Sequence, residues 1–202
     1  MTPGRPRDPG RDLALLDAAL DLLAETGYPG FTVDAVAARA KAGKATVYRR
    51  WPSKTALILD AVRRLNSRDV DLGALPDTGT LPGDLHALVG AQTGEEDERR
   101  LRVMAALVPM LAEAADDGLA ESVDAAAAEP WTAANRVLLT RARDRGEIAA
   151  DTDVETLAGV IPAMAVYRVM IRRLPIPPAY ISGLIDTVLL PAVGLRAGSS
   201  DR

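Results

Sequence analysis

The sequence contains no cysteine and a single histidine, His86. The missing cysteines exclude a disulfide framework, a thiolate zinc site and a cysteine nucleophile. A Ser-His-Asp triad or a histidine-rich metal site would have to rest on that one imidazole ring. No carboxylate cluster has an obvious metal-ligand spacing, because the acidic runs at 95–97 and 116–117 have the pattern of solvated loops. We therefore expect a protein without a metal, a cofactor or an enzymatic activity.

Phosphate-binding loops and long apolar runs are absent as well. Neither GxxxxGK[ST] nor GxGxxG occurs, so no nucleotide-binding loop is expected. No apolar run is long enough to span a bilayer, and no signal-peptide core is visible. The chain is therefore expected to be cytoplasmic. Its 202 residues allow one domain or two small ones with a sizeable core.

Charge is divided unevenly along the chain. The formal net charge is −4, which argues against a wholly basic nucleic-acid binder. Residues 1–55, however, contain 9 Lys/Arg and 6 Asp/Glu, whereas residues 56–202 contain 15 and 22. A basic N-terminal head on an acidic body would turn the head toward DNA and keep the body away from it.

The segment 31–54 has the pattern of two short helices joined by a tight turn. Thr32 is a good N-cap for the first helix, because its hydroxyl can accept a free amide of the first turn. Asp34 suits the helix dipole there. The second helix is expected over 44–50, with Val47 facing inward. The apolar positions of the first helix lie at helical spacing: Val33, Val36, Ala37 and Ala40.

Such a helix pair would read DNA with its second helix, whose first residues enter the major groove. Lys44 and Ala45 are the candidates for base edges, as a donor and as an apolar contact for a thymine methyl. Thr46, Tyr48 and Lys54 are better placed for phosphates. The residues of this segment expected at DNA are Thr32, Lys44, Ala45, Thr46, Tyr48, Arg49 and Lys54.

A purely structural helix pair is the alternative, since short helices with a Gly turn also occur in all-α cores. The run Tyr48-Arg49-Arg50-Trp51 and the basic N-terminus favour DNA binding. Trp51 itself is interpreted as a core residue that fixes the segment to the next helix. Residues 1–10 are rich in Pro and Gly and are expected to be disordered in the free protein. Arg5 and Arg7 either reach the adjacent minor groove or belong to a solvated tail.

The segments Thr32-Val33-Asp34-Ala35-Val36-Ala37, Lys44-Ala45-Thr46-Val47-Tyr48-Arg49-Arg50-Trp51 and Ser53-Lys54 closely resemble the TetR/AcrR family of transcriptional regulators. The opening Gly4-Arg5-Pro6-Arg7 is similar to that of many members. This resemblance is specific over the first quarter of the chain and extends beyond it only in helical layout. It implies a DNA-binding head of three helices, a dimeric body of about six, and repression as the commonest mode of action.

Two positions depart from the family pattern. The turn Lys41-Ala42-Gly43 has Lys41 where Gly is common. If that residue needs a positive φ, a side chain costs roughly 1 kcal/mol. The N-cap of the second helix is Gly43 where Ser is common, which costs only a few tenths of a kcal/mol.

The whole chain is predicted to be all-α, with about nine helices. The expected head is 1–55, and the expected ligand-binding and dimerisation body is 56–202. We expect a loop over 69–83, a helix pair or one long helix over 118–145 with a break at Pro130, and proline kinks at Pro109 and Pro162. The other helices are expected over 12–25, ended by Gly27, and over 53–66, 84–92, 99–115, 153–173 and 179–195.

The last two predicted helices have broader apolar faces than packing against a single core requires. They therefore either lie inside the body or form the interface of a dimer. The resemblance implies a four-helix bundle between two copies. Two heads could then read a palindrome with half-sites roughly 34–36 Å apart. The residues expected at this interface are Ile161, Ala165, Ile181, Leu184, Ile185 and Val188.

An apolar ligand pocket is expected within the body. Met adapts its shape, and Trp or Tyr adds stacking with one polar group. The candidates are His86, Met104, Leu107, Met110, Trp131, Leu138, Met164 and Tyr167, each of which is as readily a core or surface residue. The sequence thus predicts a dimeric repressor that a hydrophobic ligand releases from a palindromic DNA operator. An activator of the same fold, a helical enzyme and a helical interaction protein are the alternatives.

Overall fold

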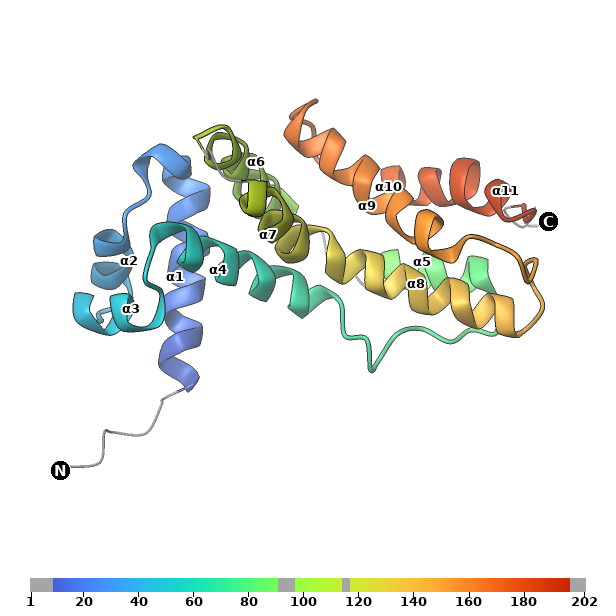
Figure 1. The fold of residues 1–202 in the computed structure, drawn as a ribbon, viewed down its shortest axis with the longest axis horizontal. Coiled ribbons are helices and arrows are strands. Elements are labelled where there is room, and N and C mark those ends of the chain that lie inside the picture. The colour runs from blue at the N-terminus through green and yellow to red at the C-terminus, as the bar shows by residue number, and fades with distance from the viewer. Residues whose placement is uncertain (1–8, 91–96, 114–116, 197–202) are drawn as a thin grey trace.

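The computed structural model describes residues 9–90, 97–113 and 117–196, and within these ranges it contains helices and connecting turns but no strand (Figure 1). The predicted all-α class is confirmed. Arg5 and Arg7 lie outside the described residues. The helices are α1 (Pro9–Gly30), α2 (Val33–Arg39), α3 (Lys44–Arg50), α4 (Lys54–Asp69), α5 (Leu81–Gly90), α6 (Asp97–Glu113), α7 (Asp117–Ala127), α8 (Glu129–Asp144), α9 (Val154–Met170), α10 (Pro178–Leu184), a π-helix (Ile185–Leu189) and α11 (Leu190–Ala192).

The helix-turn-helix, α2 and α3, forms where the sequence predicts it. Thr32 caps α2, because its Oγ1 accepts the amide of Ala35 over 3.1 Å. The tight turn is closed by a hydrogen bond of 2.8 Å from the amide of Ala42 to the carbonyl of Ala37. Val47 is fully buried and packs α3 onto the hydrophobic core of the head. The helix pair is therefore held as a rigid unit.

Helix α4 connects the head to the body (Figure 1). Ser53 caps it, since its Oγ accepts the amide of Ala56 over 3.0 Å. Trp51, which follows α3, is buried as predicted, and its Nε1 donates to Asp60 Oδ2 of α4 over 2.9 Å. This bond ties the recognition helix to the connecting helix.

Two hydrophobic clusters make up the core of the described residues. The first joins α1 to α4 and continues into α6 and α7 through Val103, Leu107, Met110, Val123 and Ala126. Helix α1 also packs directly along α6. The second cluster lies among α5, α8, α9 and the last helical segment, by which we mean α10, the π-helix and α11 together. The hydrophobic core of the head thus extends past residue 55 into the body.

Several helix boundaries differ from the sequence-based expectation. Helix α1 begins at Pro9, where proline fits the first turn, and the break near its end falls at Gly27 with φ 65°. Helix α5 begins at Leu81, because Thr80 Oγ1 accepts the amide of Gly83 over 3.2 Å. The predicted loop is therefore shortened to 70–80.

The remaining helices keep the expected order. Residues 118–145 form a pair, α7 and α8, with Pro130 in the first turn of α8. The last helical segment contains the π-helix just before Pro191. Since Pro191 has no N–H to donate to the carbonyl of Thr187, the regular α-helical hydrogen bonds cannot continue there.

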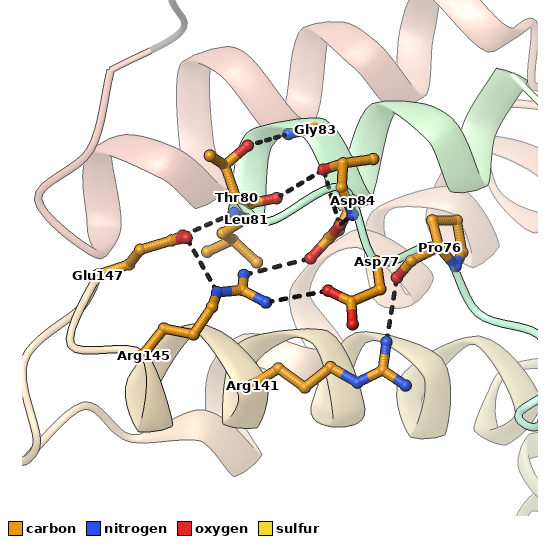
Figure 2. Close-up of polar contacts among 10 residues, drawn as sticks. Pro76, Asp77, Thr80, Leu81, Gly83, Asp84, Arg141, Arg145 and Glu147 are labelled. Atoms are coloured by element: carbon orange, nitrogen blue, oxygen red, sulfur yellow. Dashed lines mark hydrogen bonds and ion pairs between the residues drawn. The ribbon is translucent and has the colours of Figure 1, made fainter.

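An ionic cluster around the buried Asp84 fixes the start of α5 to the end of α8 (Figure 2). Asp84 is fully buried, and its Oδ2 lies 3.2 Å from Nη2 of Arg145. Arg145 Nε also contacts Glu147 Oε1 over 3.1 Å, and Glu147 Oε2 accepts the amide of Leu81 over 2.6 Å. Nearby, Arg141 Nη1 donates to the carbonyl of Pro76 over 3.0 Å. The connection after α4 is thereby anchored at its far end.

The turn of the helix-turn-helix contains a strained residue, since Lys41 has φ 49°. We expect Lys41→Gly to raise the free energy of unfolding by about 0.5–1 kcal/mol, because relief of the left-handed strain exceeds the chain entropy that glycine adds. Urea unfolding followed by circular dichroism measures this. Lys41→Ala is the matched control: it removes the charge, keeps the Cβ and should leave stability unchanged. A Gly variant no more stable than the Ala variant contradicts the prediction.

Candidate DNA-binding and ligand-binding sites

The exposed face of α3 carries the predicted DNA-reading side chains. Lys44, Ala45, Tyr48 and Arg49 are exposed, and Thr46 is partly buried. Thr32 lies at the start of α2 and is exposed, although its hydroxyl serves as the cap. All but Thr46 are therefore open to solvent in the head, and their contacts with DNA remain a prediction.

Lys44 has a partner in the free protein. Its Nζ lies 2.5 Å from Asp34 Oδ2 of α2, and the hydrogen bond to that carboxylate raises the pKa of Lys44. Both side chains are largely exposed, so water and salt screen the pair strongly. Lys44 can therefore exchange Asp34 for a DNA acceptor at little cost.

Lys54 is engaged by the head itself. Its Nζ donates to the carbonyl of Tyr28 over 2.5 Å and lies 3.8 Å from the centroid of the Tyr28 ring. The Phe31 ring centroid lies 5.9 Å away. Sequence reasoning missed this role, because the turn at 28–30 is distant from Lys54 along the chain. The phosphate contact of Lys54 stays a prediction, and the geometry adds a structural function.

The body contains an apolar cavity of about 260 Å³. Its wall is formed by the C-terminal part of α4, by α5 to α9, by the following turn and by the last helical segment. This volume is slightly below the roughly 300–1,000 Å³ typical of small-molecule sites. The cavity is therefore suited to a small ligand.

The predicted pocket residues divide into three groups. Met104, Leu107 and Trp131 line the cavity. Met110 and Leu138 are buried in the two hydrophobic clusters but do not line it. The third group, His86, Met164 and Tyr167, lies elsewhere on the body: the two α9 residues are exposed, and His86 Nε2 lies 2.9 Å from Asp186 Oδ1.

The predicted interface residues also lie differently from the expectation. Ile161, Ala165, Ile181 and Ile185 line the cavity, and Leu184 is buried within the protomer. Val188 alone of the predicted set is exposed, at 41%. The physical reason is helical phase: residues 161 and 165 turn one face of α9 inward, so 164 and 167 face outward.

Five large apolar side chains of α9 and the segments after it are exposed, and we call this set the outer face. It comprises Met164, Tyr167, Ile171, Leu174 and Val188, exposed by 39%, 47%, 67%, 38% and 41%. All five lie on or just after α9 or on the last helical segment. The apolar excess noted in the sequence is therefore real, but four predicted interface residues line the cavity and two predicted pocket residues, Met164 and Tyr167, lie on the outer face.

Four polar residues of the cavity wall escaped the sequence analysis: Asn66, Arg100, Asp124 and Asn135. A signal was present, because each lies at helical spacing from apolar wall or core residues. Asn66 follows Val62 by four residues, and Arg100 precedes Met104 by four. A polar residue within an apolar stripe is thus a useful indication of a buried polar contact.

Asn135 completes a helix that proline interrupts. Pro162 has no N–H, so the carbonyl of Ala158 loses its partner within α9. Asn135 Nδ2 of α8 donates to that carbonyl over 3.1 Å. Since Asn135 and Pro162 both line the cavity, this replacement contact forms part of the cavity wall, and the predicted kink at Pro162 stays a prediction.

Neither a metal centre nor a bilayer-spanning segment emerges from residues 9–90, 97–113 and 117–196. Within them, no three His, Cys, Asp or Glu side chains group as metal ligands would. None of the helices there has the length and apolarity needed to cross a membrane. The described features are the DNA-reading surface of the head and the cavity of the body.

A helix-turn-helix head joined by one helix to a body with an apolar cavity defines a DNA-binding regulator. The family profile described as "Bacterial regulatory proteins, tetR family" matches residues 15–61. The profile "Tetracyclin repressor-like, C-terminal domain" matches residues 75–188. The chain belongs to the TetR family of transcriptional regulators, a family of DNA-binding proteins rather than of enzymes.

Similar proteins support this assignment over nearly the full length. The chain is 35% identical to the uncharacterized HTH-type transcriptional regulator Rv1556 of Mycobacterium tuberculosis over 96% of this chain and 95% of that protein. It is also 35% identical to the DNA-binding transcriptional repressor TetR of Mycobacteroides abscessus, covering 94% and 96%. The crystal structure of the TetR family regulator SCO0332 superposes with a TM-score of 0.67 at 28% identity, covering 89% and 96%.

The contacts of Lys54 generate a stability prediction. We expect Lys54→Met to lower the free energy of unfolding by about 1–2 kcal/mol, because the Tyr28 carbonyl and ring lose a cationic partner. Chemical unfolding monitored by circular dichroism provides the measurement. Arg49→Met, at an exposed position of α3, is the control and should leave stability unchanged. Equal stability of Lys54→Met and the wild type would contradict a structural role for Lys54.

Proposed function

We propose that the protein is a dimeric repressor that leaves a palindromic operator when a small, largely hydrophobic ligand occupies the cavity. The observation that carries this proposal is the position of α4. Its first half shares a core with the recognition helix, and its residue Asn66 lines the cavity. One helix therefore contacts both the DNA-reading part and the ligand site. The named repressor function of the Mycobacteroides abscessus relative supports the sign of regulation.

We divide the molecule by function into residues 1–55, which read DNA, and residues 56–202, which bind ligand and dimerise. Lys44 and Ala45 contact bases, and Thr46, Tyr48 and Arg49 contact phosphates in this proposal. The exposure of these side chains, all but Thr46, supports it. Arg5 and Arg7 extend the same contact into the minor groove.

The outer face is the proposed dimer interface. Five large apolar side chains exposed in one region exceed the isolated exposed residues usual on monomeric proteins. A two-fold dimer would bury them against their own copies. It would also hold two heads at a fixed separation, which recognition of a palindrome requires.

Activation of transcription is the alternative sign of regulation for the same fold. Operator binding, dimerisation and ligand response would be shared by both. The position of the operator relative to the promoter decides between them, because a repressor site overlaps the polymerase site. Mapping the protected DNA in the native promoter by footprinting tests this directly. Protection upstream of the promoter, with reduced transcription on deletion of the gene, would contradict repression.

Base reading by Lys44 generates a prediction on DNA specificity. With an operator selected from a random-sequence library, Lys44→Ala should weaken operator binding roughly 5- to 150-fold and leave binding to unrelated DNA nearly unchanged. Tyr48→Phe is the comparison variant, since loss of a phosphate contact weakens binding to both DNAs equally. Gel-shift titrations over a series of salt concentrations measure both. Equal losses on both DNAs for Lys44→Ala would refute its base-reading role.

The outer face generates a prediction on assembly. Tyr167→Glu and Val188→Glu should each convert the dimer to a monomer, because a carboxylate would be buried against the partner copy without a counter-charge. Light scattering at several concentrations reports the mass. Leu72→Glu is the matched control, since Leu72 is 49% exposed but distant in sequence from the outer face. Unchanged dimers for both outer-face variants would place the interface elsewhere.

A further inference from the structure

The polar part of the cavity wall is concentrated around one side chain, Asn66 of α4. Its Oδ1 accepts from Arg100 Nη1 of α6 over 3.2 Å and from Trp131 Nε1 of α8 over 3.4 Å. Its Nδ2 donates to the carbonyl of Ala126 of α7 over 2.8 Å and to that of Val62 over 3.3 Å. Asn66 is 1% exposed, so these bonds lie in a water-poor environment. One amide therefore holds α4 to three neighbouring helices.

The two bonds to Asn66 Oδ1 are the weak members of this set. Both are long, and the acceptor is a neutral amide. A carboxylate forms shorter bonds with a guanidinium, roughly twice as strong as bonds between neutral groups. A ligand carboxylate placed at this wall would thus compete well for the same two donors.

Arg100 favours an anion for a second reason. It is half-buried, lines the cavity, and has its guanidinium carbon 5.9 Å from the centroid of the Trp131 ring. Burial lowers the pKa of Arg100. An arginine nevertheless stays protonated at neutral pH, so its guanidinium gives this part of the wall a positive charge. The other charged wall residue, Asp124, is exposed and therefore screened by solvent.

We propose that the cavity takes a small amphipathic carboxylic acid, whose carboxylate accepts from Arg100 and from the indole N–H of Trp131 and displaces the side-chain oxygen of Asn66. The apolar part of the acid lies among the aliphatic side chains of the wall, such as Leu107 and Ile161. The inference rests on the proposed function, because it names the ligand class of that cavity. The modest cavity volume favours a single chain or a small ring system.

The displacement has a direct consequence for α4. In this proposal the ligand takes the two donors that bond to Asn66 Oδ1, so occupancy of the cavity leaves Asn66 with the two bonds that its Nδ2 donates and weakens the anchoring of α4. This gives the ligand unequal affinity for the two positions of α4, which a population shift requires. At the opposite part of α4, Asp60 accepts from Trp51 next to the recognition helix. Movement of α4 is therefore transmitted to α3.

The ligand class is tested with four probes of matched shape. Decanoate and 2-naphthoate are compared with 1-decanol and 2-naphthalenemethanol by calorimetry at pH 7.5. The acids should bind the wild-type dimer at least about tenfold more tightly than the matched alcohols. Arg100→Met should remove that preference and leave the affinity of the alcohols unchanged. Arg100→Lys, which keeps the charge but loses the planar fork, should retain part of it.

Three results would overturn the assignment. The first is equal binding of acids and alcohols to the wild type. The second is an acid preference that survives in Arg100→Met. If that variant fails to fold, an undiminished acid preference in Arg100→Lys counts in the same way. The third is a failure of both acids to bind. Because these measurements need no DNA, they stay separate from the proposed function, which fails if the wild-type protein binds no operator.

Coupling through Asn66 is tested with Asn66→Asp. The new carboxylate lies beside Arg100 and occupies it in place of the ligand, so the affinity for decanoate should fall at least about tenfold. Asn66→Asp also loses the two bonds that Nδ2 donates, so release is scored relative to the operator affinity of the variant itself. Decanoate should no longer release the DNA. Leu72→Asp, which adds a carboxylate at an exposed position outside the cavity wall, is the control and should keep wild-type release. Wild-type release of operator by decanoate in Asn66→Asp would refute the role of Asn66, and so would loss of release in Leu72→Asp.

Discussion

Helix α4 has partners at both ends of its buried face, and the rest of the molecule depends on this double attachment. Near the head, Asp60 accepts from the indole of Trp51, and Leu57 and Ile58 are buried in the core of the helix-turn-helix. Toward the body, Asn66 is bonded to three other helices around the cavity. Neither end is free to move without altering contacts at the other. The helix is therefore suited to act, in the proposed function, as a lever whose position depends on the ligand in the cavity.

The contact between α5 and α8 is held by different means. Arg145 connects the end of α8 to the fully buried Asp84 near the start of α5 (Figure 2). Removing Arg145 would be costly, because the buried carboxylate of Asp84 would lose its counter-charge. The wall at α4, by contrast, is closed by long bonds to a neutral amide. In the proposed function this difference in strength directs ligand-dependent movement to α4 rather than to α5.

The sequence was sufficient to predict the head, the all-α class and most helices, because capping residues such as Thr32 and Ser53 and the apolar periodicity act locally. It was less informative for the body. Helices α9 and α10 are apolar over more than one face, so periodicity could not decide which face turns inward. Ile161, expected at the interface, therefore lines the cavity, and Met164, expected in the pocket, is exposed on the outer face. The roles of Lys54 and Asn66 depend on contacts between distant segments, which no local pattern encodes.

The packing of α1 along α6 has a consequence for how such regulators diversify. The hydrophobic core that supports the recognition helix is completed by Val103, Leu107 and Met110 from the body, and Arg99 of α6 pairs with Asp21 of α1 over 2.5 Å. A recombination event that exchanged only the first 55 residues with those of a distant homologue would join two unmatched surfaces. Successful recombinants would have to inherit α6 together with the head, although the 41 residues 56–96 lie between the two in the sequence. DNA specificity is thus freer to evolve by substitutions on α3 than by domain exchange.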